Sequence, residues 1–247
     1  MSRELRVDLD RPREVPALIG DALRIWVRNL RVFLPIAVVV VVPVDAAVLG
    51  LGLGEFHGGY TSSPPVSHSL ITLAAQLLVS APLVNVMTLH ALMQISHGER
   101  PSARRSIVAG LDAFSTVFWP VLVMVAVVAA TVWILVGIVL FVRWYFIPQV
   151  VVVDRRSGLE PLRASWDLTR GYGLRVAGIV LLTNLMFGLV GGAVSGPLLS
   201  LAKSADSQAL ALAWTTLLEV LVAAPAGLVA ALMFFDLRAR GARRVAA

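Results

Sequence analysis

The chain has no cysteine, only one lysine and few charged residues, which make up 15% of its 247 residues. The lack of cysteine excludes a disulfide framework and thiolate chemistry. There is no GxxxxGK[ST] motif and no GxGxxG motif between a strand and a helix, so nucleotide binding is unsupported. An ordinary soluble domain is excluded because 58% of the residues are hydrophobic, against about 45–50% in soluble proteins.

Residues suited to catalysis are scarce as well. Glu55, His57 and His68 belong to a loop rich in Gly, Ser and Pro, but their spacing matches no zinc signature. His90 and His97 lie near the end of an apolar run, where hydrogen bonding at a membrane interface is a commoner role than catalysis. We therefore predict a non-enzymatic protein with neither a cofactor nor a metal.

The sequence is rich in long apolar runs, each close to or above the about 20 residues that cross about 30 Å of hydrocarbon. They cover residues 33–53, 69–96, 117–153, 174–202 and 208–236. Of the 21 basic residues, 19 lie in four polar segments, 1–32, 97–116, 154–175 and 237–247.

Five crossings would divide these basic segments between the two sides of the membrane, against the positive-inside rule. A hairpin within the run 117–153, turning near Val136-Gly137, puts all four segments on one side. The charge pattern therefore predicts six transmembrane helices with both termini in the cytoplasm.

The predicted fold class is all-α: a polytopic bundle of six transmembrane helices spanning residues 15–240, between short tails at 1–14 and 241–247. Segments starting at Pro16, Pro101 and Pro161 each precede one hairpin, so we interpret the chain as three pseudo-repeated hairpins. Each repeat begins with a short amphipathic helix that can lie at the membrane interface. The alternative is a juxtamembrane linker that folds only against the bundle. Twenty arginines against one lysine indicate a GC-rich bacterial genome, which places the chain in a bacterial inner membrane. The basic charge then attracts anionic lipids at the cytoplasmic face, and nucleic acid is not an expected partner.

Four polar residues in apolar runs have similar heights when residues are counted from the cytoplasmic ends at about 1.5 Å each. They are Asp45, Asn85, Arg143 and Asn184. Because an isolated charge in hydrocarbon is costly, we expect Arg143 to pair with Asp45. The layer could bind a polar headgroup or ion, or could only hold the bundle together. Glu219 lies nearer the outer surface, without an evident partner.

Small residues recur every four positions in the fifth predicted helix, at Gly188, Gly192 and Gly196. Such a stripe lets another backbone approach closely. We expect it to pack on the sixth helix, at Ala223, Gly227 and Ala231, with a homodimer contact as the alternative. Pro43, Pro82, Pro148 and Pro225 are expected to kink or break their helices.

Most of the chain, roughly residues 15 to 240, is similar to a known family. Five segments resemble the glycerophosphoryl diester phosphodiesterase membrane-domain family: Val142 to Pro148, Val151 to Asp154, Gly158 to Trp166, Leu168 to Gly171 and the closing Phe234 to Arg240. Asp154 stands where that family has glutamate. The chain is too short to add the about 250 residues of a phosphodiesterase barrel, so the resemblance implies a stand-alone membrane module without hydrolase activity.

Together these features predict a non-enzymatic integral membrane protein with a role in envelope or lipid homeostasis. The alternative is a transporter or flippase-like carrier of an amphiphilic or anionic solute, with Arg143 as the anchor, and a third reading is a membrane-embedded lipid enzyme. A carrier requires a solvent-reachable cavity that contains Arg143 and Asp45, whereas a scaffold requires the two to be buried and paired.

Overall fold

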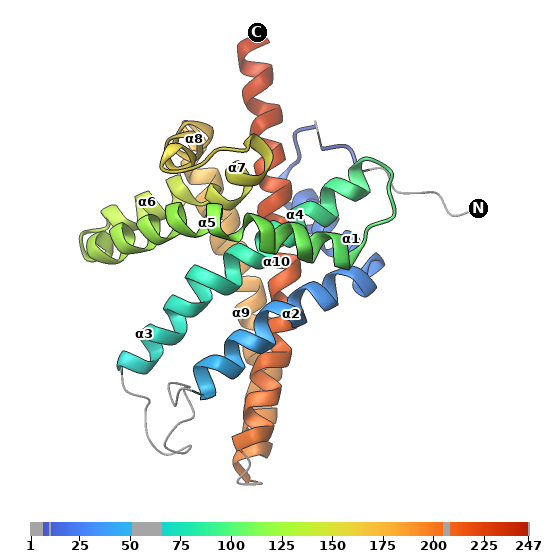
Figure 1. Ribbon diagram of the computed structural model, residues 1–247, viewed down its shortest axis with the longest axis vertical. Helices are drawn as coiled ribbons and strands as arrows, with labels where there is room; N and C mark the ends of the chain where they lie inside the picture. The colour runs from blue at the N-terminus through green and yellow to red at the C-terminus, as the bar shows by residue number, and fades with distance from the viewer. Residues whose placement is uncertain (1–6, 10, 51–65, 205–207, 247) are drawn as a thin grey trace.

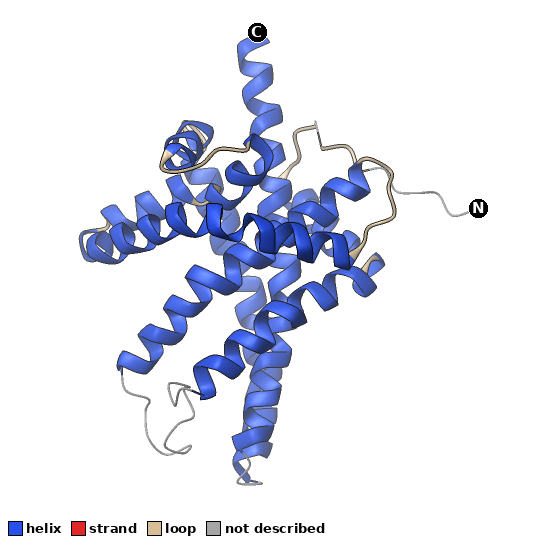
Figure 2. Cartoon of the chain, in the orientation of Figure 1, coloured by secondary structure: helices blue, strands red, loops and turns tan. Residues whose placement is uncertain are grey.

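The computed structural model describes residues 7–9, 11–50, 66–204 and 208–246. Every secondary-structure element in these ranges is a helix (Figures 1 and 2). The α-helices are α1 (Val15–Arg28), α2 (Leu30–Gly50), α3 (Val66–Ala75), α4 (Ala81–Ser96), α5 (Ala103–Thr131), α6 (Val136–Trp144), α7 (Ile147–Asp154), α8 (Glu160–Thr169), α9 (Gly173–Ser204) and α10 (Gln208–Ala246).

The predicted hairpin in the long third apolar run is confirmed. α5 ends at Thr131 and α6 begins at Val136, after one turn of 3₁₀-helix and a left-handed Leu135 with φ 61°. Gly137 makes the turn possible, because a Cβ there would lie 2.5 Å from the backbone nitrogen of Val132. The described residues thus contain six helical stretches long and apolar enough to cross a membrane, and the chain is a multi-pass membrane protein.

The second of these stretches is not a uniform α-helix. A single π-helical turn, Gln76–Ser80, joins α3 to α4. Pro82 follows two residues later, and its ring cannot tolerate the carbonyl group four positions earlier in a regular α-helix. Widening the preceding turn relieves that clash and rotates the residues before it about the helix axis.

α10 is the central helix of the molecule. It packs against α1, α2, α4 and α9, and 61% of its most apolar stretch is buried, against 17% for α9. The core around it includes Phe33, Met87, Phe146, Leu228 and Phe234. α9 therefore lies at the outside of the protein, with most of its surface left for lipid.

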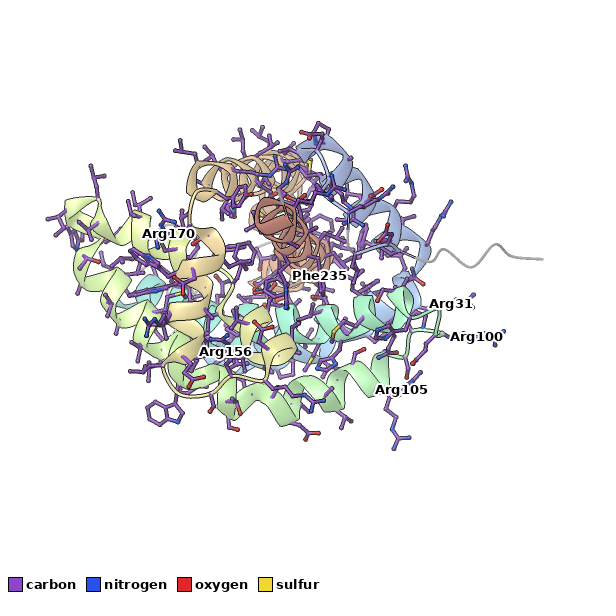
Figure 3. All side chains as sticks on the ribbon, turned by 90° about the horizontal axis from the view of Figure 1, so that it is seen from above. Arg31, Arg100, Arg105, Arg156, Arg170 and Phe235 are labelled. Carbon is purple, nitrogen blue, oxygen red and sulfur yellow. The ribbon has the colours of Figure 1, made fainter. Side chains whose placement is uncertain are left out.

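The six helices are not parallel. Figures 1 and 3 view the molecule along perpendicular directions. In both views, α5 and α6 run crosswise to α10. The position of a residue along its own helix is therefore a poor measure of its depth in the membrane.

Three of the four predicted basic segments meet near the C-terminal end of α10. The backbone N–H of Arg13 and the side chain of Arg175 both donate hydrogen bonds to Asp236, and Arg238 pairs with Asp154 at 2.8 Å. We call this part of the molecule the arginine-rich side. Figure 3 shows Arg31, Arg100 and Arg105 on one flank of it and Arg156 and Arg170 on the other.

Candidate functional site

A cavity of about 250 Å³ lies between α2, the second membrane-spanning stretch and the first half of α10. The ends of α2 and α3 and the start of α10 that line it lie far from the C-terminus (Figure 1). We call it the acidic cavity. Apolar walls come from leucines on all three elements, and its main polar lining residues are Asp45, Ser69, Thr72, Gln76, Thr216 and Glu219.

Two carboxylates from different helices face this cavity. Asp45 accepts a hydrogen bond of 2.7 Å from the Thr216 hydroxyl, and Glu219 accepts one of 3.2 Å from the Gln76 amide. A carboxylate can accept about four hydrogen bonds, so each keeps most of its capacity. Neither takes part in any ion pair found among the described residues.

Helical spacing brings the polar groups to the cavity. Thr215, Thr216 and Glu219 recur three and four residues apart and share one face of α10. Thr72 and Gln76 are four residues apart, in α3 and at the first position of the π-helical turn. The Thr72 hydroxyl oxygen is shielded from solvent and has no hydrogen-bond partner. A polar ligand entering the cavity would find both carboxylates and this hydroxyl.

The predicted pair between Arg143 and Asp45 is wrong. Arg143 instead donates a hydrogen bond of 2.8 Å to the Thr169 carbonyl group, and its guanidinium stacks 5.2 Å from the ring centroid of Trp166. The depth count failed because the chain leaves the helical path after Trp144 and starts a separate helix, α7, at Ile147. Arg143 therefore contacts α8 on the arginine-rich side.

The polar layer as a whole is not formed either. Asn184 is exposed and its amide donates to the Val180 carbonyl group in its own helix. Asn85 faces α10 at Gly227, where its side-chain oxygen would lie 3.2 Å from a Cβ. Of the four predicted residues, only Asp45 lines the acidic cavity.

The glycine stripe on α9 does not pack as expected. Gly188, Gly192 and Gly196 are exposed, and a Cβ added at any of them would meet no atom within 4 Å. On α10 the close approach is at Gly227, and its partner is α4: a Cβ there would lie 2.6 Å from the Thr88 hydroxyl. Gly227 of α10 thus serves the contact with α4.

The break between α6 and α7 is held by α8. The Ser165 hydroxyl donates to the Arg143 carbonyl group at 2.8 Å and accepts from the Phe146 N–H at 3.2 Å. Pro148 stands in the first turn of α7, where it needs no N–H partner, so its expected helix break is confirmed. The motif residues around Arg143 and Ser165 therefore secure a backbone turn.

Asp236 forms a second polar centre, which sequence reasoning did not single out. Its side chain is fully buried and accepts hydrogen bonds from the Arg13 N–H and from the side chains of Arg175 and Arg240. Arg175 and Arg240 also donate to the Arg13 carbonyl group. We call this group the Asp236 clamp, because it joins the N-terminal segment to α9 and α10.

The described residues contain no group of three or more His, Cys, Asp or Glu side chains placed to hold a metal ion. Glu55 and His57 lie outside the part of the chain that the structure describes, as does the side chain of His68.

The fold and the acidic cavity define an all-α, multi-pass membrane protein. Residues 66–235 match the family model described as a domain of unknown function (DUF7847), and the chain belongs to this family. No curated protein and no solved structure matches it.

Proposed function

We propose that this protein is a non-enzymatic membrane protein that binds a small organic ammonium group in the acidic cavity. The observation that carries the proposal is the presence of Asp45 and Glu219, from two different helices, on the wall of one cavity inside the apolar helices. An ionisable group within a membrane-spanning helix is expensive to keep there and usually has a functional reason.

The ligand is cationic because the cavity lining within the described residues has two acids and no basic residue. Arg143, the anchor expected for an anionic solute, contacts Thr169 and Trp166 instead. The ligand is organic because the walls include Leu49, Leu73 and Leu212 beside a few polar groups, which is the pattern of small-molecule pockets. An amine-bearing amphiphile fits both requirements, which favours the carrier reading over a purely structural one.

A wider role in envelope or lipid homeostasis accompanies this binding. In support, the arginine-rich side gives the protein an attraction for anionic lipids, worth about 1 kcal/mol for each basic residue near the surface. With that side in the cytoplasm of a bacterial inner membrane, the positive-inside rule is satisfied.

The proposed amphipathic interfacial helices are α1 and α8, which precede the α2 and α9 spans. α1 buries Leu18, Ala22 and Ile25 and exposes Arg24 and Arg28. The second repeat has no separate helix here, since α5 is continuous from Ala103. We also propose that the chain is related to the glycerophosphoryl diester phosphodiesterase membrane domain and that it consists of three repeated hairpins.

The test is a calorimetric titration of the purified protein in non-ionic detergent with butylammonium chloride. Asp45→Asn and Glu219→Gln keep the size of each side chain and remove its charge. We expect each to weaken binding about tenfold or more, because hydrogen bonds to charged groups are worth about 1.5–3 kcal/mol. Asp112→Asn is the matched control, since Asp112 is an exposed acid on α5.

Unchanged affinity in both cavity variants would reject the site. Equal binding of sodium and butylammonium would reject the organic ligand class. Uptake of labelled butylammonium into proteoliposomes then decides between a carrier and a binding protein.

A further inference from the structure

A second cavity, of about 220 Å³, lies on the arginine-rich side between the N-terminal segment, α1 and the end of α4. Four arginines and two aspartates of the described chain line it, so this part of its wall has a formal excess of two positive charges. Ile25 and Ile95 contribute apolar surface. We call it the arginine cavity; its lining arginines are Arg11, Arg13, Arg24 and Arg28.

The two aspartates do not neutralise this surface. Asp21 is shared by three guanidinium groups of the cavity, at 3.2 Å from Arg24, 3.4 Å from Arg13 and 3.9 Å from Arg11. Arg13 is buried and also donates to the backbone carbonyl groups of Asp8 and Arg11, so it has a structural role. The remaining arginines are exposed and keep donors for a ligand.

Arg24 and Arg28 are the two best-placed donors. They stand four residues apart on α1 and therefore share one face of the helix. Arg28 has no hydrogen-bond or ion-pair partner among the residues that the structure describes, and Arg24 makes one contact, with Asp21. A guanidinium presents five N–H donors in a planar fork that matches the oxygens of a phosphate group.

The surroundings select a phosphate that belongs to a lipid. Val27, between the two arginines, is 57% exposed, and Leu30, the first residue of the α2 span, is 38% exposed. A free anion gains nothing from apolar side chains beside its site, whereas a lipid can place its phosphate on the arginines and its chains along α2. The Asp236 clamp holds one wall of the cavity in place, because the Arg13 backbone is bound to Asp236 and Arg240.

We propose that the arginine cavity is a binding site for the phosphate group of an anionic lipid, with Arg24 and Arg28 as the residues that contact the phosphate. This inference deepens the attraction for anionic lipids proposed above and rests on it. The attraction for anionic lipids is then located at one defined site and is not spread over the whole arginine-rich side.

The experiment compares two double variants with the same change in net charge. Arg24→Gln with Arg28→Gln removes the two donors, and Arg104→Gln with Arg163→Gln removes two exposed arginines outside the cavity. Each purified protein, with folding checked by circular dichroism, is titrated in non-ionic detergent with dihexanoyl phosphatidic acid, dihexanoyl phosphatidylcholine and inorganic phosphate. We expect phosphatidic acid to bind the unaltered protein, with the affinity falling about tenfold or more in the cavity variant and less than about twofold in the control.

The other outcomes separate the two proposals. Equal losses in the two double variants would overturn the cavity site and leave only diffuse attraction by net charge. Binding of inorganic phosphate as tight as that of phosphatidic acid would overturn the lipid source. No preference of the unaltered protein for phosphatidic acid over phosphatidylcholine would overturn both the site and the wider attraction for anionic lipids.

Discussion

The Asp236 clamp gives the sharpest prediction about stability. Asp236→Ala removes a fully buried carboxylate and leaves Arg175 and Arg240 without their shared acceptor. Breaking a buried ion pair on one side costs about 3–5 kcal/mol. The arginine side chains are 20% and 23% exposed and can regain some hydration, so we expect a loss near the low end, about 3 kcal/mol.

The assay is equilibrium unfolding in mixed micelles of dodecyl sulfate and a non-ionic detergent, followed by circular dichroism. Asp154→Ala is the matched control, because its pair with Arg238 joins side chains that are 26% and 45% exposed. Surface pairs of this kind contribute about 0–1 kcal/mol. If the two variants lost the same free energy of unfolding within about 0.5 kcal/mol, the clamp would be an ordinary surface interaction and the reasoning would be refuted.

Two further predictions concern backbone contacts. Ser165→Ala removes the hydroxyl that serves Phe146 and Arg143, and we expect a loss of about 1–3 kcal/mol in the same unfolding assay; a change below about 0.5 kcal/mol would show that α8 does not hold the turn. Gly227→Leu must displace Thr88 and Asn85, whereas Gly192→Leu meets no atom within 4 Å. Only the first should lose the monodisperse peak in size-exclusion chromatography, and a loss in the second would restore the packing role of the α9 stripe.

The position and number of the membrane spans could be predicted, because the apolar runs and the distribution of the arginines can both be read from the sequence. The hairpin at Gly137 followed from the side on which the later arginines must lie, and the structure confirms it with the left-handed turn at Leu135. The direction of the α5–α6 hairpin could not be predicted, because the length of an apolar run does not fix its tilt.

The candidate site was only partly predictable. Asp45 is visible in the sequence as a charge inside an apolar run, but its partner Thr216 is 171 residues away, and no local pattern links the two. The π-helical turn that precedes Pro82 was equally hidden, although Gln76 is a polar residue in the same apolar run. Asp236 was visible only as part of the closing segment Phe234 to Arg240, and the residues next to it in the sequence do not indicate that it is buried.

α10 connects both candidate sites while keeping them apart. Its first half provides Thr216 and Glu219 to the acidic cavity, and its last part provides Asp236 to the clamp that positions one wall of the arginine cavity. From Glu219 to Asp236 the helix rises by about 26 Å. Between them Gly227 meets α4 at a contact too close for a side chain, which fixes the helix in the core. The two cavities are thus held by different contacts of one continuous helix, so a variant that weakens one site leaves the contacts of the other in place.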